Sequence, residues 1–76
     1  MKKKLTPNQQ FGLRVRELRL ARGWSQEELG ARCGIDRTYV SGVERGVRNP
    51  TLTVVAAIAV GLETPLRELF SASEGH

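Results

Sequence analysis

The sequence has almost none of the residues that metal sites and catalytic centres use. Among its 76 residues there are one cysteine, Cys33, and one histidine, His76. One cysteine cannot form an intrachain disulfide, and these two side chains cannot supply the four ligands of a structural zinc site. A serine or cysteine nucleophile would need the last residue as its base. We therefore expect no metal, no cofactor, no small-molecule ligand and no enzymatic activity.

Long apolar runs are also missing. The longest covers residues 54–62, about half of the roughly 20 residues that a membrane-spanning helix needs. Lys2, Lys3 and Lys4 are followed by polar residues, where a secretory signal would have an apolar region. We expect a cytoplasmic protein with no membrane partner, in which Cys33 stays reduced.

Positive charge is what the sequence has in excess. The formal net charge is +4 and the isoelectric point is about 10.0. Residues 1–24 carry seven Lys or Arg and one Glu, whereas residues 51–76 carry one Arg and three Glu. A basic first third on a small domain favours a polyanionic partner, although such runs also occur as ordinary solvated surface.

Helix start and stop signals divide the chain into short segments. Side chains that can cap a helix start occur five times, at Thr6, Ser25, Asp36, Thr51 and Thr64. Glycines suited to helix ends follow the first four, at Gly23, Gly34, Gly46 and Gly61. No segment alternates polar and apolar residues as a strand would. The pattern predicts one all-α domain, a compact five-helix fold, with a core over about 7–70, a basic arm over 1–6 and a frayed tail over 71–76.

Residues 26–45 predict a helix-turn-helix. Leu29 and Val40 face inward from two short helices, and Gly34 gives a tight turn between them. The second of these helices then presents an outward face that fits the major groove of DNA. That face consists of Arg37, Thr38, Ser41 and Arg45.

This segment resembles the helix-turn-helix of the phage repressor/Cro (Xre-like) family. The spacing of Gln26, Gly34, Ser41 and Glu44 carries the resemblance, which extends over roughly residues 8–70. Residues 36–45, followed by Arg48-Asn49, are most similar to the controller proteins of restriction–modification systems. The resemblance implies a repressor-like fold and a transcriptional regulator that binds a pseudo-palindromic operator as a homodimer. The resemblance also implies that double-stranded DNA and a second copy of the chain are partners, with RNA polymerase as a further candidate.

The expected DNA contacts divide into two groups. Arg37, Thr38 and Ser41 are expected to read base edges, because they start the outward face of the recognition helix. The expected contacts to the DNA backbone or groove are Ser25, Gln26, Tyr39, Arg45, Arg48 and Asn49. Tyr39 has two equally supported roles from the sequence, packing against the base of the helix or contacting DNA. Lys2, Lys3 and Lys4 either follow a neighbouring groove of the DNA or belong to a loose arm.

Two structural roles complete the sequence prediction. By resemblance, Arg19 and Glu44 form a partly buried ion pair. By the same resemblance, the dimer interface is expected in an apolar cluster, for which the alternative role is the core of a single chain. The cluster consists of Leu62, Leu66, Leu69 and Phe70. Leu13 and Leu20 either cover the fifth helix or are exposed. The alternative function is a helix-turn-helix protein-interaction module, such as an antitoxin or adaptor, for which an apolar outward face would be expected.

Overall fold

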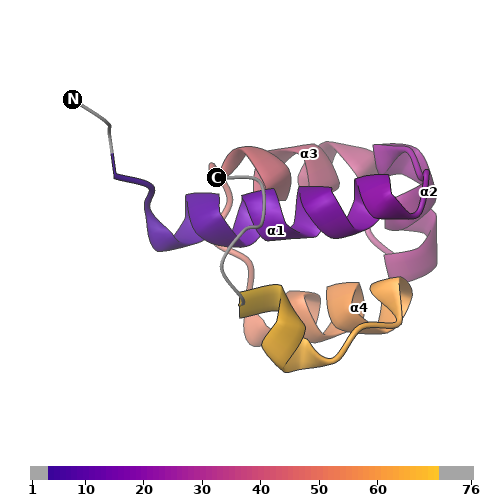
Figure 1. Ribbon diagram of the computed structural model, residues 1–76. Coiled ribbons are helices and arrows are strands. Elements are labelled where there is room, and N and C mark those ends of the chain that lie inside the picture. The colour runs from indigo at the N-terminus through magenta and orange to yellow at the C-terminus, as the bar shows by residue number, and fades with distance from the viewer. Residues whose placement is uncertain (1–3, 71–76) are drawn as a thin grey trace.

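The computed structural model describes residues 4–70, which form four α-helices and one short 3-10 helix (Figure 1). The elements in chain order are α1 (Pro7–Ala21), α2 (Gln26–Cys33), α3 (Arg37–Arg45), α4 (Leu52–Leu62) and η1 (Leu66–Phe70). There is no strand within residues 4–70, which confirms the all-α class. In Figure 1, α1 runs between α3 above it and α4 with η1 below it. None of the helices in this range is long and apolar enough to cross a membrane.

The four α-helices begin where the capping signals predict. The Thr6 hydroxyl accepts a hydrogen bond from the backbone of Gln9 (3.1 Å), and the Gln9 side chain accepts one from the backbone of Thr6 (2.9 Å). These two bonds form the complete capping box that opens α1. Ser25, Asp36 and Thr51 cap the other three helices through one side-chain acceptor each. Local chemistry therefore fixes each helix start.

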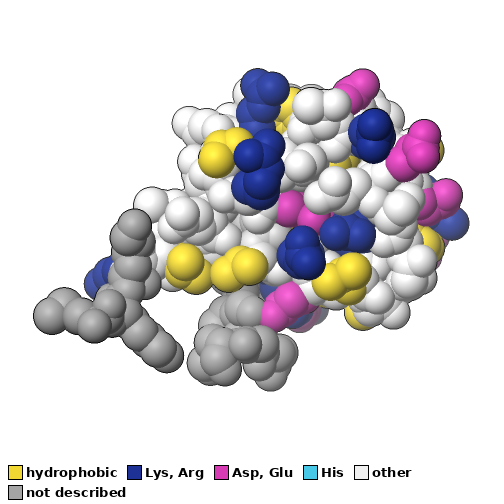
Figure 2. All heavy atoms as spheres, turned by 90° about the horizontal axis from the view of Figure 1, so that it is seen from above, with side chains coloured by type: hydrophobic (Ala, Val, Ile, Leu, Met, Phe, Trp, Pro, Cys, Tyr) yellow, Lys and Arg dark blue, Asp and Glu magenta, His cyan; other side chains and the backbone are white. Residues whose placement is uncertain are grey.

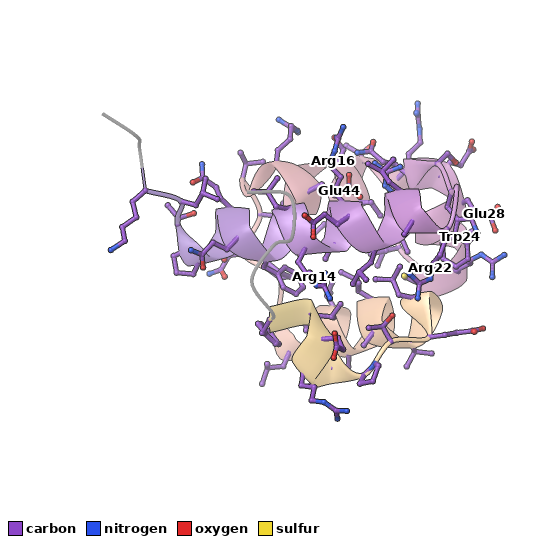
Figure 3. The ribbon with its side chains drawn as sticks, viewed as in Figure 1. Arg14, Arg16, Arg22, Trp24, Glu28 and Glu44 are labelled. Carbon is purple, nitrogen blue, oxygen red and sulfur yellow. The ribbon has the colours of Figure 1, made fainter. Side chains whose placement is uncertain are left out.

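The prediction of a fifth α-helix was wrong. Residues Leu66–Phe70 form a 3-10 helix, in which the Glu68 amide donates to the Pro65 carbonyl at 2.9 Å. Five residues are too few to repay the cost of starting an α-helix. Thr64 does not cap this segment, because its hydroxyl donates to the Leu62 carbonyl and accepts from Arg22, the residue after α1. Figure 3 shows Arg22 between α1 and the end of α4.

The prediction that Gly61 ends α4 was also wrong. The helix continues to Leu62, and the left-handed residue after it is Glu63, with φ of 53°. Gly61 lies inside the helix and is buried, and a β-carbon there would overlap Sγ of Cys33 in α2. The glycine therefore permits the close approach of α4 and α2 and does not stop the helix. The other predicted glycine ends are left-handed, as expected.

Every element contributes to one apolar core. Val15, Leu29, Leu62 and Leu69 are each 0% exposed, and they come from four different elements. Leu69 fixes η1 against the rest of the domain. The other buried apolar side chains are Phe11, Val40, Val43, Val55, Ile58 and Ala59.

Candidate nucleic-acid interface

The corner between α2 and α3 is tight because two glycines permit it. Gly34 adopts a left-handed conformation with φ of 73°, and the Ile35 amide then donates to the Gly30 carbonyl at 2.9 Å. A β-carbon on Gly30 would lie 2.5 Å from the Ile35 carbonyl oxygen. A side chain there would push α2 and α3 apart, so the steep corner depends on this glycine.

One side of α3 is buried and the other is free. Val40 and Val43 are 2% and 1% exposed, respectively. Arg37, Thr38 and Arg45 are exposed on the opposite side, and Ser41 is half-buried between them. Figure 2, seen from above and so from the α3 side of Figure 1, shows Lys and Arg side chains at several points on this face. The residues predicted to read bases therefore share one accessible surface.

The start of α3 is fixed by Asp36. Its carboxylate accepts a hydrogen bond of 2.7 Å from the Thr38 amide, and this bond lowers the pKa of the carboxyl. A carboxylate at this position also interacts favourably with the positive end of the helix dipole. Arg37 follows directly, and its side chain has no hydrogen bond or ion pair with any residue in 4–70. Its guanidinium is free to bind a ligand.

A buried ion pair holds α3 against α1. Arg19 Nε donates to Glu44 Oε2 at 2.6 Å, and Arg19 Nη2 donates to Glu44 Oε1 at 2.9 Å. These side chains are only 8% and 2% exposed. The hydrogen bond to Glu44 raises the pKa of Arg19. Figure 3 shows Glu44 where α3 meets α1. The ion pair that the resemblance implied is present, and its two-point geometry fixes how α3 is presented.

The predicted phosphate contacts at the start of α2 already have partners within the domain. Gln26 Nε2 donates to Glu44 Oε1 at 3.0 Å, so its side chain joins the ion pair. The Ser25 hydroxyl accepts from the Glu28 amide at 3.0 Å. Ser25 is exposed and Gln26 is half-buried. This network connects the start of α2 with the recognition helix.

The loop after α3 returns Arg48 to the helix. The guanidinium carbon of Arg48 lies 5.2 Å from the centre of the Tyr39 ring, a cation–π contact. Tyr39 is half-buried and packs against the core, and Asn49 is exposed. Sequence reasoning overlooked Gly42, which lies beneath the Arg48 side chain. Its signal was a glycine in the middle of a helix, which needs a packing or functional reason.

The predicted dimer cluster is divided by the structure. Leu62 and Leu69 are both 0% exposed, so they fill the core of a single chain, the alternative that the sequence left open, and they expose no surface for the predicted interface. The spacing of apolar residues in the sequence does not show whether another element of the same chain or a second copy covers them. Leu66 and Phe70 are 48% and 63% exposed and remain available.

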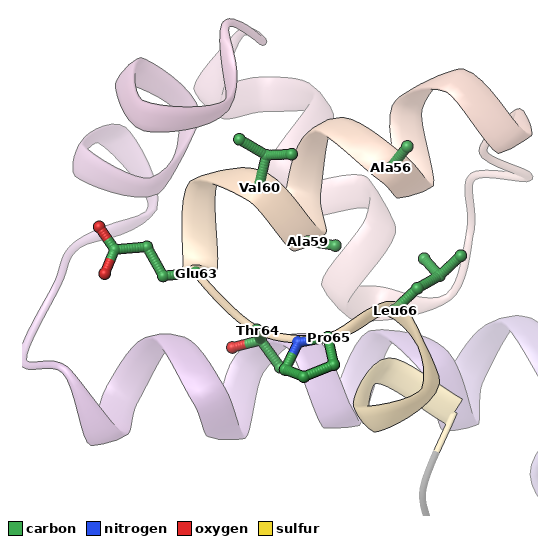
Figure 4. A pocket seen from close by; sticks show the side chains of 7 residues that line it. All are labelled: Ala56, Ala59, Val60, Glu63, Thr64, Pro65 and Leu66. Atoms are coloured by element: carbon green, nitrogen blue, oxygen red, sulfur yellow. The ribbon is translucent and has the colours of Figure 1, made fainter.

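An apolar hollow lies beside Leu66, between the end of α4 and η1 (Figure 4). Its volume is about 530 Å³. The residues that line it are Ala56, Ala59, Val60, Glu63, Thr64, Pro65 and Leu66.

Two open questions from the sequence concern α1 and the arm before it. Leu13 and Leu20 are 36% and 52% exposed, which agrees with the second of the two alternatives. Of the N-terminal lysines only Lys4 is described, and it is exposed. Lys2, Lys3 and the tail 71–76 lie outside the described residues, and within 4–70 no group of His, Cys, Asp or Glu could hold a metal ion.

The steep α2–α3 corner, with one side of α3 buried and the other exposed, defines a helix-turn-helix protein. A family profile described as helix-turn-helix matches residues 15–69. The chain belongs to this family.

Several similar proteins are regulators by name. The crystal structure of the restriction-modification controller protein C.AhdI from Aeromonas hydrophila superimposes with a TM-score of 0.81 at 51% identity, covering 83% of this chain and 96% of that one. Control protein C.BamHI of Bacillus amyloliquefaciens is 40% identical over 60 residues, which are 78% of this chain and 74% of that protein. A hypothetical transcription factor of Neisseria meningitidis is 50% identical over 48 residues, 63% of this chain, and the match spans 45% of its length.

Proposed function

We propose that the chain is a sequence-specific DNA-binding transcriptional regulator. The observation that carries the proposal is the exposed face of α3, where Arg37, Thr38 and Arg45 lie on one side of a helix fixed by the Arg19–Glu44 pair. A helix of this kind enters the major groove with its first residues at the base edges. Arg37 suits guanine, because its two donors match the O6 and N7 acceptors.

The proposed contacts divide as their positions suggest. Arg37, Thr38 and Ser41 read bases. The residues beside these base-reading side chains approach the sugar–phosphate backbone or the edge of the groove. They are Ser25, Gln26, Arg45, Arg48 and Asn49. Gln26 reaches a phosphate through its backbone at the start of α2, because its side chain is held by Glu44. Tyr39 acts indirectly, because its ring supports the side chain of Arg48.

The regulator acts as a homodimer in this proposal. Val60 and Leu66 expose apolar surface around the hollow, Phe70 exposes more at the end of η1, and a second copy would cover it. This surface and α3 lie on opposite sides of α1 in Figure 1, so pairing there leaves α3 uncovered. Two recognition helices would then read a pseudo-palindrome with half-sites about one helical turn apart.

The regulated genes are proposed from the similar proteins. C.AhdI and C.BamHI are control proteins by name, and the first is a restriction-modification controller. By this likeness the chain regulates a restriction–modification operon in the cytoplasm, with RNA polymerase as a candidate partner. The same likeness supports the expectation that it is not an enzyme. The polar character of the α3 face favours DNA over a protein partner.

Selection of bound duplexes from a random pool tests the proposal. The wild-type protein is expected to enrich a two-fold symmetric sequence, and Arg37→Ala is expected to lose the enrichment at one base pair in each half-site. Recovery of random sequences by the wild type would contradict sequence-specific binding. Recovery of no duplex at all would favour the protein-interaction alternative.

A further inference from the structure

Gly42 occupies an unexpected position in α3. Glycine in the middle of a helix makes the folded state less stable than alanine does, because the glycine backbone loses more conformational freedom on folding. The residues one turn away toward the outward face, Thr38 and Arg45, are exposed, yet Gly42 is buried. Something outside the helix must therefore cover it.

The side chain that covers Gly42 is that of Arg48. A β-carbon on Gly42 would lie 2.6 Å from Cγ of Arg48, 3.3 Å from its Nε and 3.5 Å from its Cδ. These atoms are the three nearest to that position. The alkyl part of Arg48 therefore lies directly on the helix backbone, in a space that any larger residue would fill.

The end of α3 brings Arg48 back to this space. Gly46 is left-handed, with φ of 76°, and its amide donates to the Val43 carbonyl at 3.0 Å. The Val47 amide donates to the Gly42 carbonyl at 3.0 Å. This pair of bonds reverses the chain, and Arg48 follows immediately.

Tyr39 forms the second wall. It lies one turn before Gly42 on the same flank of α3, and its ring is 5.2 Å from the guanidinium carbon of Arg48. The ring packs against the core, so its position is fixed. Within residues 4–70, Arg48 has no hydrogen bond or ion pair, so all its N–H donors are available.

We propose that Gly42 and Tyr39 form a slot that holds Arg48 beside the exposed face of α3, so that Arg48 reaches the DNA together with the recognition helix. Gly42 is then a positioning residue for DNA binding, although it has no side chain to touch DNA. This inference rests on the proposed function. A prearranged arginine has less freedom to lose on binding, which improves affinity.

The slot is tested first without DNA, by NMR of the free protein. The Nε–H proton of Arg48 is expected upfield of those of the other exposed arginines, because the Arg48 guanidinium lies over the Tyr39 ring. Gly42→Ala is expected to move it toward the ordinary value while the protein keeps its helical circular dichroism and melts no lower than the wild type. An unshifted Arg48 signal in the wild type would overturn the slot.

The binding role is tested by a double-mutant cycle on the duplex that the wild type selects. Gly42→Ala and Arg48→Ala are each expected to weaken binding about five-fold or more, the loss expected when one charge-assisted hydrogen bond to the DNA is removed. Added to Arg48→Ala, Gly42→Ala is expected to cause no further loss. Tyr39→Leu, which keeps an apolar residue against the core, provides a second variant if Gly42→Ala folds poorly, and it too is expected to lose its effect without Arg48.

Two results would overturn the inference while the proposed function stands. One is wild-type affinity in Gly42→Ala. The other is an equal loss with and without Arg48, which would mean that Gly42 acts through the helix itself. If the wild type binds no duplex, the proposed function fails and Gly42 has no DNA role, while the Arg48 signal still decides whether the slot exists.

Discussion

The α3 face and the α4–η1 face differ in what supports them and in what they leave exposed. The α3 face exposes arginine, and a buried ion pair fixes it from beneath. The α4–η1 face exposes Val60, Leu66 and Phe70 above the core residues Leu62 and Leu69. A charged face suits a polyanion and an apolar face suits another copy of the chain. In each face the residues that hold the surface in place are distinct from those that would touch a partner.

The largest effect should come from the support of the apolar face. Leu69→Ala shortens a side chain with no solvent exposure, so we expect the free energy of unfolding to fall by about 2–5 kcal/mol. Thermal melting followed by circular dichroism measures the change. A variant that stays fully folded and becomes monomeric would mean that Leu69 belongs to the interface after all.

The support of the charged face should be nearly as sensitive. Glu44→Ala leaves the Arg19 guanidinium without its acceptor in a buried place, at a cost of about 1–3 kcal/mol. Chemical denaturation of the variant gives this value, and Glu28→Ala, which breaks the exposed pair with Arg32, is a control expected to change stability by less than about 1 kcal/mol. Equal losses in the two variants would remove the special role of the buried pair.

Exposed apolar residues should affect assembly and leave the fold intact. Leu66→Glu places a charge beside the hollow, and we expect the dimer to dissociate at least about ten-fold more readily. Leu52→Glu is the matched control, because Leu52 is 81% exposed at the start of α4 and does not line the hollow. Sedimentation that shows the same dimer for both variants would place the interface elsewhere.

The smallest expected effect is a gain in stability at the edge of the apolar face. Glu63 is left-handed at the end of α4, where glycine is preferred and a negative charge opposes the helix dipole. We expect Glu63→Gly to raise stability by about 1 kcal/mol. Differential scanning calorimetry can detect this increase. A lower melting temperature would show that the Glu63 side chain makes a stabilising contact that outweighs the backbone strain.

Features that depend on neighbouring residues could be predicted from the sequence. Thr6 and Gln9 cap α1 as expected, and Gly23, Gly34 and Gly46 are left-handed. Each of these results from steric and hydrogen-bonding preferences within a few residues. The recognition helix and its exposed face followed from the same local signals.

Features that depend on distant residues could not be predicted in this way. Gly61 carries the same local signal as Gly46, but its role is set by Cys33 in another helix. Leu69 and Leu66 look alike in the sequence, and only the packing of η1 shows that the first is buried. The Arg19–Glu44 pair joins residues 25 positions apart and followed only from the family resemblance.

Titration of the wild type and Arg37→Ala with the selected duplex and with a scrambled one tests the central claim most directly. A guanidinium that reads a guanine contributes about 1–3 kcal/mol against the wrong base, so Arg37→Ala should weaken binding to the selected duplex far more than to the scrambled one. Equal weakening on both duplexes would show that Arg37 contributes charge alone, and unchanged binding on both would contradict the assignment of α3 as the recognition helix.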